Sequence, residues 1–407
     1  MSTKEETEPP GSHPRSSGTV SVSGAGALNG SPPRGTTLAA APEARSATTN
    51  GADTGSPYYV LDGVATIEPE LDAHRRAAAD PTRAVSERLE AYEDIIDSEI
   101  GDTPLTRLRN VEREVGLRQI FAKFEGGNPS GSQKDRIAFA QALDALRRGY
   151  DAVTVATCGN YGAALALAAS LAGLRCVAFI PRPYHARRVE EIEKHGATIV
   201  RGGEDYEEAV ALSHELARSE DIYDANPGGP NLLTQMHAYG SIAYEIYDEL
   251  RDAPAAVAVP VSNGTTLAGI HRGFLSLYRR GKTSRIPRMV AGSSFKKNPI
   301  VQAWLNNLPH CEDLHPKKVR ETAVNEPLIN WHSIDGDHAL AAVRETGGWA
   351  ADASDKNLLD SAKLIREREG LSVLPASTAG LVALLERHRK EPLTGDRYVV
   401  ILTGRKA

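Results

Sequence analysis

Three short apolar segments of this chain each end in a loop of glycine and small polar residues, and each loop leads directly into a helix-forming segment. The apolar segments span residues 119–125, 151–156 and 256–261. Their alternating or continuously apolar pattern is typical of strands that are at least half buried. Strands that alternate with helices in this way favour an α/β fold built on parallel sheets, in which ligands bind at the carboxyl ends of the strands. The sequence therefore predicts that the functional residues lie in these loops.

The first loop, EGGNPSGSQ over residues 125–133, is followed by Lys134. Apolar residues at helical spacing continue from there to Leu146, which places Lys134 in the first turn of a helix. The unpaired N–H groups and the positive dipole end of a helix disfavour a protonated ammonium group. Because only a neutral amine attacks a carbonyl carbon, Lys134 is a candidate for Schiff-base chemistry. The alternative is a lysine that simply extends into solvent.

The second loop, TCGNYG over residues 157–162, lies between a buried strand and an alanine-rich helix over residues 163–172. Backbone N–H groups at such a helix start bind a carboxylate or a phosphate, and Asn160 could reach an oxygen of the bound ligand. The alternative is an ordinary turn in which glycines serve only the backbone geometry.

The third loop, SNGTT over residues 262–266, opens a helix that runs to about Tyr278. Small hydroxyl residues and a glycine at a helix start form a phosphate cradle without a basic side chain. The loop lacks the lysine and spacing of a P-loop, and no GxGxxG motif follows the first strand, so a cofactor with a single phosphate fits better than a nucleotide.

A last strand, residues 397–402, runs into Thr403 near the end of the sequence. A hydroxyl at the carboxyl end of a parallel strand faces the crevice where such folds bind ligands. Thr403 could therefore meet a ring nitrogen, or it could make only a local hydrogen bond.

These motifs, in this order, resemble the fold-type II pyridoxal-phosphate enzymes of the tryptophan synthase beta superfamily and, among them, threonine synthase. The resemblance covers roughly residues 98–405. It implies an α/β fold of two doubly wound domains with the cofactor between them. Three later segments look more like threonine synthases than like cysteine synthases or threonine dehydratases: TAVNEPLINW at 322–331, AAVRETGG at 341–348 and PASTAG at 375–380.

The resemblance implies a role for each loop. Lys134 would bind pyridoxal 5'-phosphate as a Schiff base and then act as acid and base at the substrate Cα. Asn160 would donate a hydrogen bond to the 3′ oxygen of the cofactor, and the neutral hydroxyl of Thr403 would face the ring nitrogen, which favours elimination and replacement over transamination. The cofactor phosphate would be held by Ser262, Asn263, Gly264, Thr265 and Thr266, and the substrate carboxylate by Thr157, Cys158, Gly159 and Tyr161.

Several residues near this chemistry depart from the threonine synthase pattern. Gln133 stands where phenylalanine is usual, Cys158 where serine is usual, Tyr161 where threonine is usual, and Leu374 where glutamate is typical. The 262–266 loop also replaces a glycine-asparagine repeat. Conversion of O-phosphohomoserine to threonine is the first expectation for the activity.

Two alternatives stay open. One is a paralogue that performs β-replacement or elimination on another amino acid, as cysteine synthase, cysteate synthase or threonine dehydratase does. The other is a non-catalytic amino-acid sensor, since a fold does not fix a function. The intact set of Lys134, Asn160 and Thr403 argues against the sensor.

The chain is expected to divide into a tail and two domains. Residues 1–57 are rich in Ser, Gly, Thr, Ala and Pro, so they predict a disordered tail. An ordered lead-in follows, with a helix near residues 82–97. The resemblance implies a larger cofactor-binding domain over residues 58–125 plus 239–407, and a smaller mobile domain over 126–238. It also implies a homodimer.

The composition of the chain limits the kinds of partner that we expect. The net charge of -6, without a clustered basic face, argues against nucleic acid. No run approaches the roughly 18 to 20 apolar residues of a membrane span. The three cysteines, Cys158, Cys176 and Cys311, show no metal-ligand spacing, so we expect no metal site and a reducing cytoplasm. Cys158 could be a nucleophile at a helix start, but a substitute for serine in the carboxylate loop is the preferred interpretation.

Two basic segments have both a functional and a plain interpretation. Residues 181–188, PRPYHARR, could recruit an anionic leaving group or could form a solvated helix face. Lys296 and Lys297 could face the substrate or lie exposed on a loop.

Overall fold

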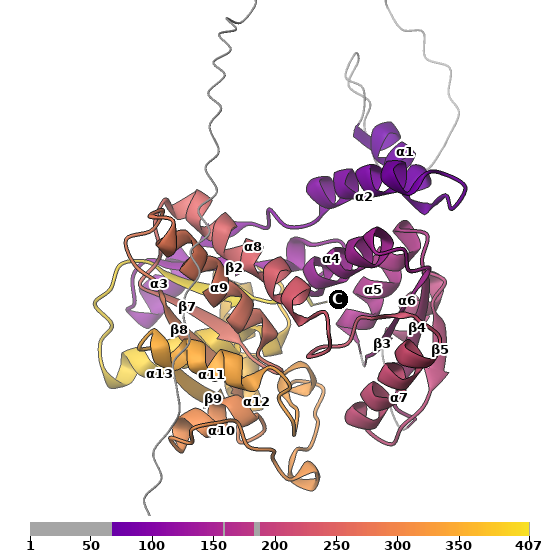
Figure 1. Ribbon diagram of the computed structural model, residues 1–407. Coiled ribbons are helices and arrows are strands. Elements are labelled where there is room, and N and C mark those ends of the chain that lie inside the picture. The colour runs from indigo at the N-terminus through magenta and orange to yellow at the C-terminus, as the bar shows by residue number, and fades with distance from the viewer. Residues whose placement is uncertain (1–66, 158, 183–187, 407) are drawn as a thin grey trace, which may run out of the picture. The chain divides into compact units, whose positions relative to one another are not determined.

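The computed structural model describes residues 67–157, 159–182 and 188–406, with side chains from residue 71 onward (Figure 1). The predicted tail over residues 1–57 lies outside the described residues, as do Cys158 and residues 183–187. Within the described part, none of the helices is long and apolar enough to span a membrane.

The larger sheet has six strands in the order β1-β2-β10-β7-β8-β9. β1 is antiparallel to β2, and the other neighbours are parallel. Strand β10, from the end of the chain, lies between β2 and β7, with Tyr398 opposite Ile120 on one side and Ala256 on the other. The bounds are Leu105–Arg107 for β1, Ile120–Phe124 for β2, Ala256–Pro260 for β7, Arg288–Ser294 for β8, Trp349–Ala353 for β9 and Tyr398–Leu402 for β10.

The smaller sheet has four strands in the order β5-β4-β3-β6, and all its neighbours are parallel. Val153 of β3 lies opposite Cys176 of β4 and Tyr223 of β6. The bounds are Ala152–Ala156 for β3, Arg175–Ile180 for β4, Thr198–Arg201 for β5 and Tyr223–Asp224 for β6. The two mostly parallel sheets confirm the predicted α/β class.

Helices connect and cover these strands. Helix α4 packs on α5 and α8, α8 lies along α9, and α13 covers β7, β8 and β9 (Figure 1). The helices are α1 Ile67–Ala79, α2 Val85–Glu99, α3 Arg109–Val115, α4 Lys134–Arg147, α5 Asn160–Leu171, α6 Val189–Lys194, α7 Tyr206–Ser219, α8 Leu232–Leu250, α9 Thr265–Arg279, α10 Pro299–Leu305, α11 Gly336–Glu345, α12 Asp355–Glu369 and α13 Ala379–Lys390.

The central strands are buried on both faces, as parallel strands covered by helices must be. Because side chains alternate along a strand, Val399 and Ile401 of β10 join one apolar cluster, whereas Val400 and Leu402 join another on the opposite face. The first cluster also contains Val153 and Ala178 of the smaller sheet. One continuous core therefore includes residues from both sheets.

The strands expected around the three loops and near the chain end are present as β2, β3, β7 and β10, and the expected helix at 82–97 corresponds to α2. The predicted alternation of strands and helices continues through β4, β5 and α7. Among the strands, the sequence reasoning did not anticipate β1, β6, β8 and β9, and it did not anticipate α1 either.

Candidate active site

Lys134 is the first residue of α4, as the sequence predicts. The loop before it is fixed to the end of β10, because the backbone N–H of Gln133 donates to the carbonyl of Thr403 at 2.9 Å and Ser132 pairs with Gly404 in an isolated antiparallel bridge. The two sequence motifs that contain Lys134 and Thr403 therefore meet at one edge of the larger sheet.

A buried ionic network supports the first turn of α4. Arg136 donates to the carboxylates of Glu125 and Glu245, each at 2.6 Å, and Lys123 also pairs with Glu245. Arg136, Glu125 and Lys123 are almost completely buried. The two carboxylates raise the pKa of the Arg136 guanidinium above its ordinary value, against the opposing effect of burial. The network thus joins β2, α4 and α8 just behind Lys134.

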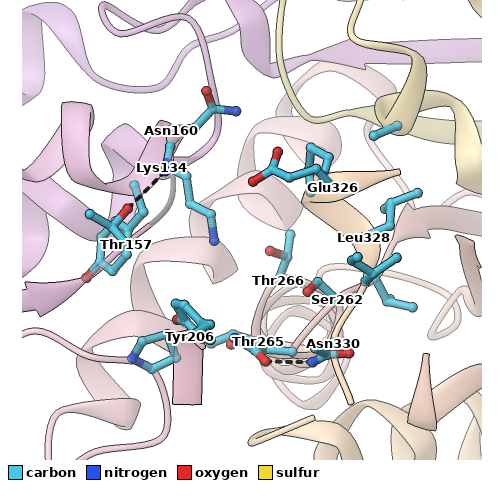
Figure 2. Close-up of a pocket in the computed structure, with 18 of the residues that line it drawn as sticks. Lys134, Thr157, Asn160, Tyr206, Ser262, Thr265, Thr266, Glu326, Leu328 and Asn330 are labelled. Carbon is cyan, nitrogen blue, oxygen red and sulfur yellow. Dashed lines mark hydrogen bonds between the residues drawn. The ribbon is translucent and has the colours of Figure 1, made fainter. Parts of the chain in front are cut away.

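The side chain of Lys134 extends into a cavity (Figure 2). It is only partly covered, but the surrounding protein removes most bulk water from its amine, and this desolvation lowers the pKa of Lys134 to about 8. The negative charge of Asp335 opposes the shift. The sequence analysis attributed a lowered pKa to the helix start, whereas burial is the largest cause here. The Nζ atom lies 5.5 Å from the centre of the Tyr161 ring.

The second loop follows β3 and opens α5. The hydroxyl of Thr157 accepts hydrogen bonds from the N–H groups of Gly162 at 2.8 Å and Gly159 at 3.3 Å, so this side chain shapes the loop. A Cβ at position 162 would lie 2.4 Å from Cγ2 of Thr157, which explains the glycine. Asn160 begins α5, and its side-chain oxygen accepts a hydrogen bond from Arg188 at 2.8 Å.

Tyr161 occupies the position where threonine is usual in the resembling family. Its ring lines the cavity beside Lys134, but its hydroxyl donates to the carbonyl of Ala225 at 2.6 Å and accepts from the amide of Gln141. The hydroxyl of Tyr161 is therefore held by the protein itself.

The third loop forms the predicted helix start. Gly264 has φ of 97°, a left-handed conformation that favours glycine, and α9 begins at Thr265. Thr265 and Thr266 are buried. The side chain of Asn263 accepts a hydrogen bond from Asn330 at 2.8 Å, which holds the loop in place. Ser262, Asn263, Gly264, Thr265 and Thr266 all line the cavity that contains Lys134.

Asp335 is a residue of this site that the sequence reasoning missed. Its carboxylate accepts a hydrogen bond from the hydroxyl of Thr265, and its backbone N–H donates to the carbonyl of Asn263 at 3.1 Å. Burial raises the pKa of Asp335. No local pattern marks this aspartate, because it reaches the loop from a segment far away in the sequence.

Thr403 lies at the end of β10 and lines the cavity. Its hydroxyl also donates to Ser377 at 3.2 Å. Thr403 therefore makes a local hydrogen bond and also lines the cavity, while its contact with a ring nitrogen stays a prediction.

The cavity has a volume of about 400 Å³, and elements connected to both sheets line it. It brings together the sequence-predicted residues Lys134, Thr157, Gly159, Asn160, Tyr161, the 262–266 loop and Thr403. Cys158 lies outside the described residues.

The sequence reasoning missed a second wall of the cavity. This wall comes from the start of α7 and from the segment 319–331, and it is rich in carboxylates. Figure 2 shows Glu326 extending into the space that Lys134 enters from the other side. Burial raises the pKa of Glu207 to about 6. Among the described residues of the lining, Lys134 is the only lysine or arginine, whereas five carboxylates are present: Glu204, Asp205, Glu207, Glu321 and Glu326.

The two basic segments contribute little to the described lining. Neither Lys296 nor Lys297 is part of it, and Lys297 donates to the carbonyl of Arg320 at 2.7 Å. Arg182 pairs with Glu204 on the surface, and Arg188 pairs with Glu191 and Asn160. Residues 183–187 lie outside the described part.

The groups in this cavity fit pyridoxal phosphate by their chemistry. A lysine amine of lowered pKa suits an aldehyde, hydroxyls and backbone N–H groups at the start of α9 suit a phosphate, and a strand-end hydroxyl suits a ring nitrogen. The fit needs no metal and no basic side chain at the phosphate cradle.

Comparison with known proteins agrees with this fit. The chain is 29% identical to the threonine synthase of Methanocaldococcus jannaschii and 30% identical to that of Methanosarcina acetivorans, in each case over 305 residues that make up 74% of this chain and 74% of the relative. Among solved structures, maize serine racemase has a TM-score of 0.66 at 20% identity, covering 78% of this chain and 92% of that chain. The processed form of threonine deaminase isoform 2 from Solanum lycopersicum has a TM-score of 0.63 at 16% identity, covering 81% and 92%.

These two structural likenesses show the fold, and the sequence relatives show that the chain is similar to threonine synthases. A family model described as pyridoxal-phosphate dependent enzyme matches residues 96–404. The chain belongs to the pyridoxal-phosphate-dependent enzymes, in their fold-type II group.

Proposed function

We propose that this enzyme eliminates or replaces a group at Cβ or Cγ of an α-amino acid. The observation that carries the proposal is the lysine amine of lowered pKa in the same cavity as a hydroxyl-lined helix start and a strand-end hydroxyl. When bound, pyridoxal phosphate supplies an electron sink that stabilises negative charge at the substrate Cα. The neutral hydroxyl of Thr403 at the ring nitrogen suits elimination and replacement better than transamination.

In this proposal Lys134 holds the cofactor and moves the proton at the substrate Cα. A pKa of about 8 lies close to the working pH, where a general base is most effective. Residues 262–266 hold the phosphate, and Asn160 meets the 3′ oxygen. The loop of Thr157, Cys158, Gly159 and Tyr161 receives the substrate carboxylate.

For the substrate, the similarity to threonine synthases supports O-phosphohomoserine, with loss of phosphate from Cγ and addition of water at Cβ to give threonine. A second candidate is elimination or replacement on another activated amino acid. It is favoured by the carboxylates in the cavity wall, since these repel a substrate phosphate.

Product formation with O-phosphohomoserine, O-phosphoserine, O-acetylserine and threonine separates the two candidates. We expect turnover with at least one of these substrates. The variant Lys134→Ala should lose turnover altogether, whereas Lys297→Ala, outside the described lining, should retain it. Inactivity on O-phosphohomoserine would exclude the threonine synthase reaction, and ligand binding without any turnover would favour the amino-acid sensor.

We also propose the division into a larger domain over residues 58–125 plus 239–407 and a smaller mobile domain over 126–238. It is supported by the two sheets, since β3, β4, β5 and β6 all fall within the smaller part. We further propose that the protein is a homodimer and that it is located in the cytoplasm. Light scattering of the purified protein tests the dimer, and a monomeric mass would exclude it.

A further inference from the structure

Outside the cofactor loops, part of the cavity lining carries side-chain hydrogen-bond acceptors. We call two of these residues the acceptor wall: Glu207 at the start of α7 and Gln235 near the start of α8. Neither belongs to the loops assigned to the cofactor or to the substrate carboxylate. Because they lie outside those loops, we expect them to contact the side chain of the substrate.

Gln235 is completely buried, and its amide orientation is fixed. Its Nε2 donates to Oε1 of Gln141 at 3.1 Å and to the carbonyl of Asn226 at 2.9 Å. Both partners are acceptors, so the amide nitrogen must face them and Oε1 must face the other way. Within the described residues, this Oε1 atom has no hydrogen-bond partner. A buried acceptor without a donor is costly, so binding would favour a ligand N–H group that reaches this atom.

Glu207 supplies a carboxylate that has no lysine or arginine partner in the described part of the chain. Its charged form is favoured by its own backbone N–H and by Trp331 and His332 nearby. Neighbouring acids have other partners: Asp205 accepts from the N–H of Glu208 as the cap of α7, and Glu204 pairs with Arg182 at the surface. Glu207 itself is half-buried. A half-buried carboxylate attracts a cation more strongly than an exposed one, because less water screens it.

We propose that the amino-acid substrate carries a positively charged amino or guanidino group on its side chain, with Glu207 supplying the opposite charge and Gln235 accepting an N–H. This inference rests on the proposed function, since it takes the amino acid to be bound at Lys134. A phosphate-bearing side chain would bring negative charge into a lining that already holds five carboxylates. A cationic side chain would instead offset the charge of Glu207 and bring N–H donors.

Calorimetric titration of the holoenzyme with amino acids that carry no leaving group tests the proposal. Ornithine and norleucine are the matched pair, because they have side chains of equal length and differ in the terminal ammonium group. We expect ornithine to bind at least about tenfold more tightly than norleucine, and O-phosphohomoserine to bind more weakly than either.

Substitutions test whether Glu207 and Gln235 cause the preference for ornithine over norleucine. Glu207→Gln should reduce the preference for ornithine to about threefold or less while leaving the affinity for norleucine unchanged. Gln235→Leu should weaken ornithine more than norleucine. The control Glu215→Gln removes an exposed carboxylate of α7 outside the cavity and should keep the full preference.

Three outcomes would overturn the proposal. Equal binding of ornithine and norleucine by the wild type would do so, as would tighter binding of O-phosphohomoserine. So would a preference that survives in Glu207→Gln. Butylamine tests a further possibility. If it strengthens the binding of norleucine while ornithine shows no advantage, the site binds a separate amine, and the assignment of the positive charge to the substrate side chain is wrong.

Different results would contradict the proposed function. Absence of turnover with every amino acid, despite measurable binding, would contradict the catalytic assignment and leave the ornithine preference standing. Turnover of O-phosphohomoserine together with weak ornithine binding would contradict only the charge preference.

Discussion

Lys134 loses bulk water without losing access to the cavity. Its amine is desolvated beside the ring of Tyr161, and this lowers the pKa to about 8, while the charge of Asp335 acts in the opposite direction. Asp335 also holds the hydroxyl of Thr265 in the predicted phosphate cradle. A single carboxylate therefore contacts the cradle and influences the lysine.

The pH dependence of Lys134 reactivity follows from this pKa. In cofactor-free protein, the neutral amine fraction should rise with pH and reach about half near pH 8, well below the ordinary lysine value of about 10.4. Acetylation by acetic anhydride, followed by mass spectrometry of the peptide containing Lys134, measures this midpoint. Asp335→Asn should move the midpoint to lower pH because it removes a charge that stabilises the ammonium form. A midpoint near 10 in the wild type would contradict the desolvation argument.

At the scale of elements, α8 and α9 pack closely because glycines lie between them. A Cβ at position 273 would lie 2.5 Å from the carbonyl oxygen of Gly240, and a Cβ at position 269 would lie 2.7 Å from Cβ of Tyr239. The close packing matters for the site, because α9 carries the 262–266 loop at its start and α8 carries Gln235.

Gly273→Ala should therefore force the two helices apart. We expect a loss of about 1–3 kcal/mol in the free energy of unfolding, although alanine has the better helix propensity. Chemical denaturation monitored by circular dichroism measures the loss. Arg272→Ala, an exposed change one residue earlier on α9, should have a much smaller effect. A Gly273→Ala protein as stable as the wild type would mean that α8 and α9 are further apart than described.

At the scale of the whole molecule, the chain passes from the larger sheet to the smaller one through β2, the loop before Lys134, and α4. The ionic network of Arg136, Glu125, Glu245 and Lys123 lies at this passage and is largely shielded from water. Breaking a buried network leaves a charge without compensation, which costs more than an exposed ion pair contributes.

Arg136→Met should destabilise the protein by about 3–5 kcal/mol, because Glu125 would remain buried without its partner. The control is Arg147→Met on the same helix, whose partner Glu93 is exposed, and its effect should stay below about 1 kcal/mol. Urea denaturation of the two variants measures the difference. Similar stability of both variants would show that the network is hydrated.

The positions of many strands, loops and helix starts depend on local patterns of residues, and the sequence predicts them for that reason. Strand alternation, glycine-containing loops and helix starts depend on residues close together in the chain, so the segments at 119–125, 151–156 and 256–261 predict β2, β3 and β7 and the loops that follow them. The parallel α/β class follows from the same alternation. Edge strands such as β6, with only two residues, carry too little pattern to be recognised.

The sequence by itself determined the fold class and the order of the loops that meet at the cavity, and it predicts that Lys134 is the reactive lysine and that these loops hold the cofactor. Only the tertiary structure decided which distant residues complete the site: Asp335 beside Thr265, and Glu207 and Gln235 in the acceptor wall. It also decided that burial lowers the pKa of Lys134. The physical reason is that desolvation and charge depend on all atoms within a few ångströms, and most of those atoms here come from segments that are far apart along the chain.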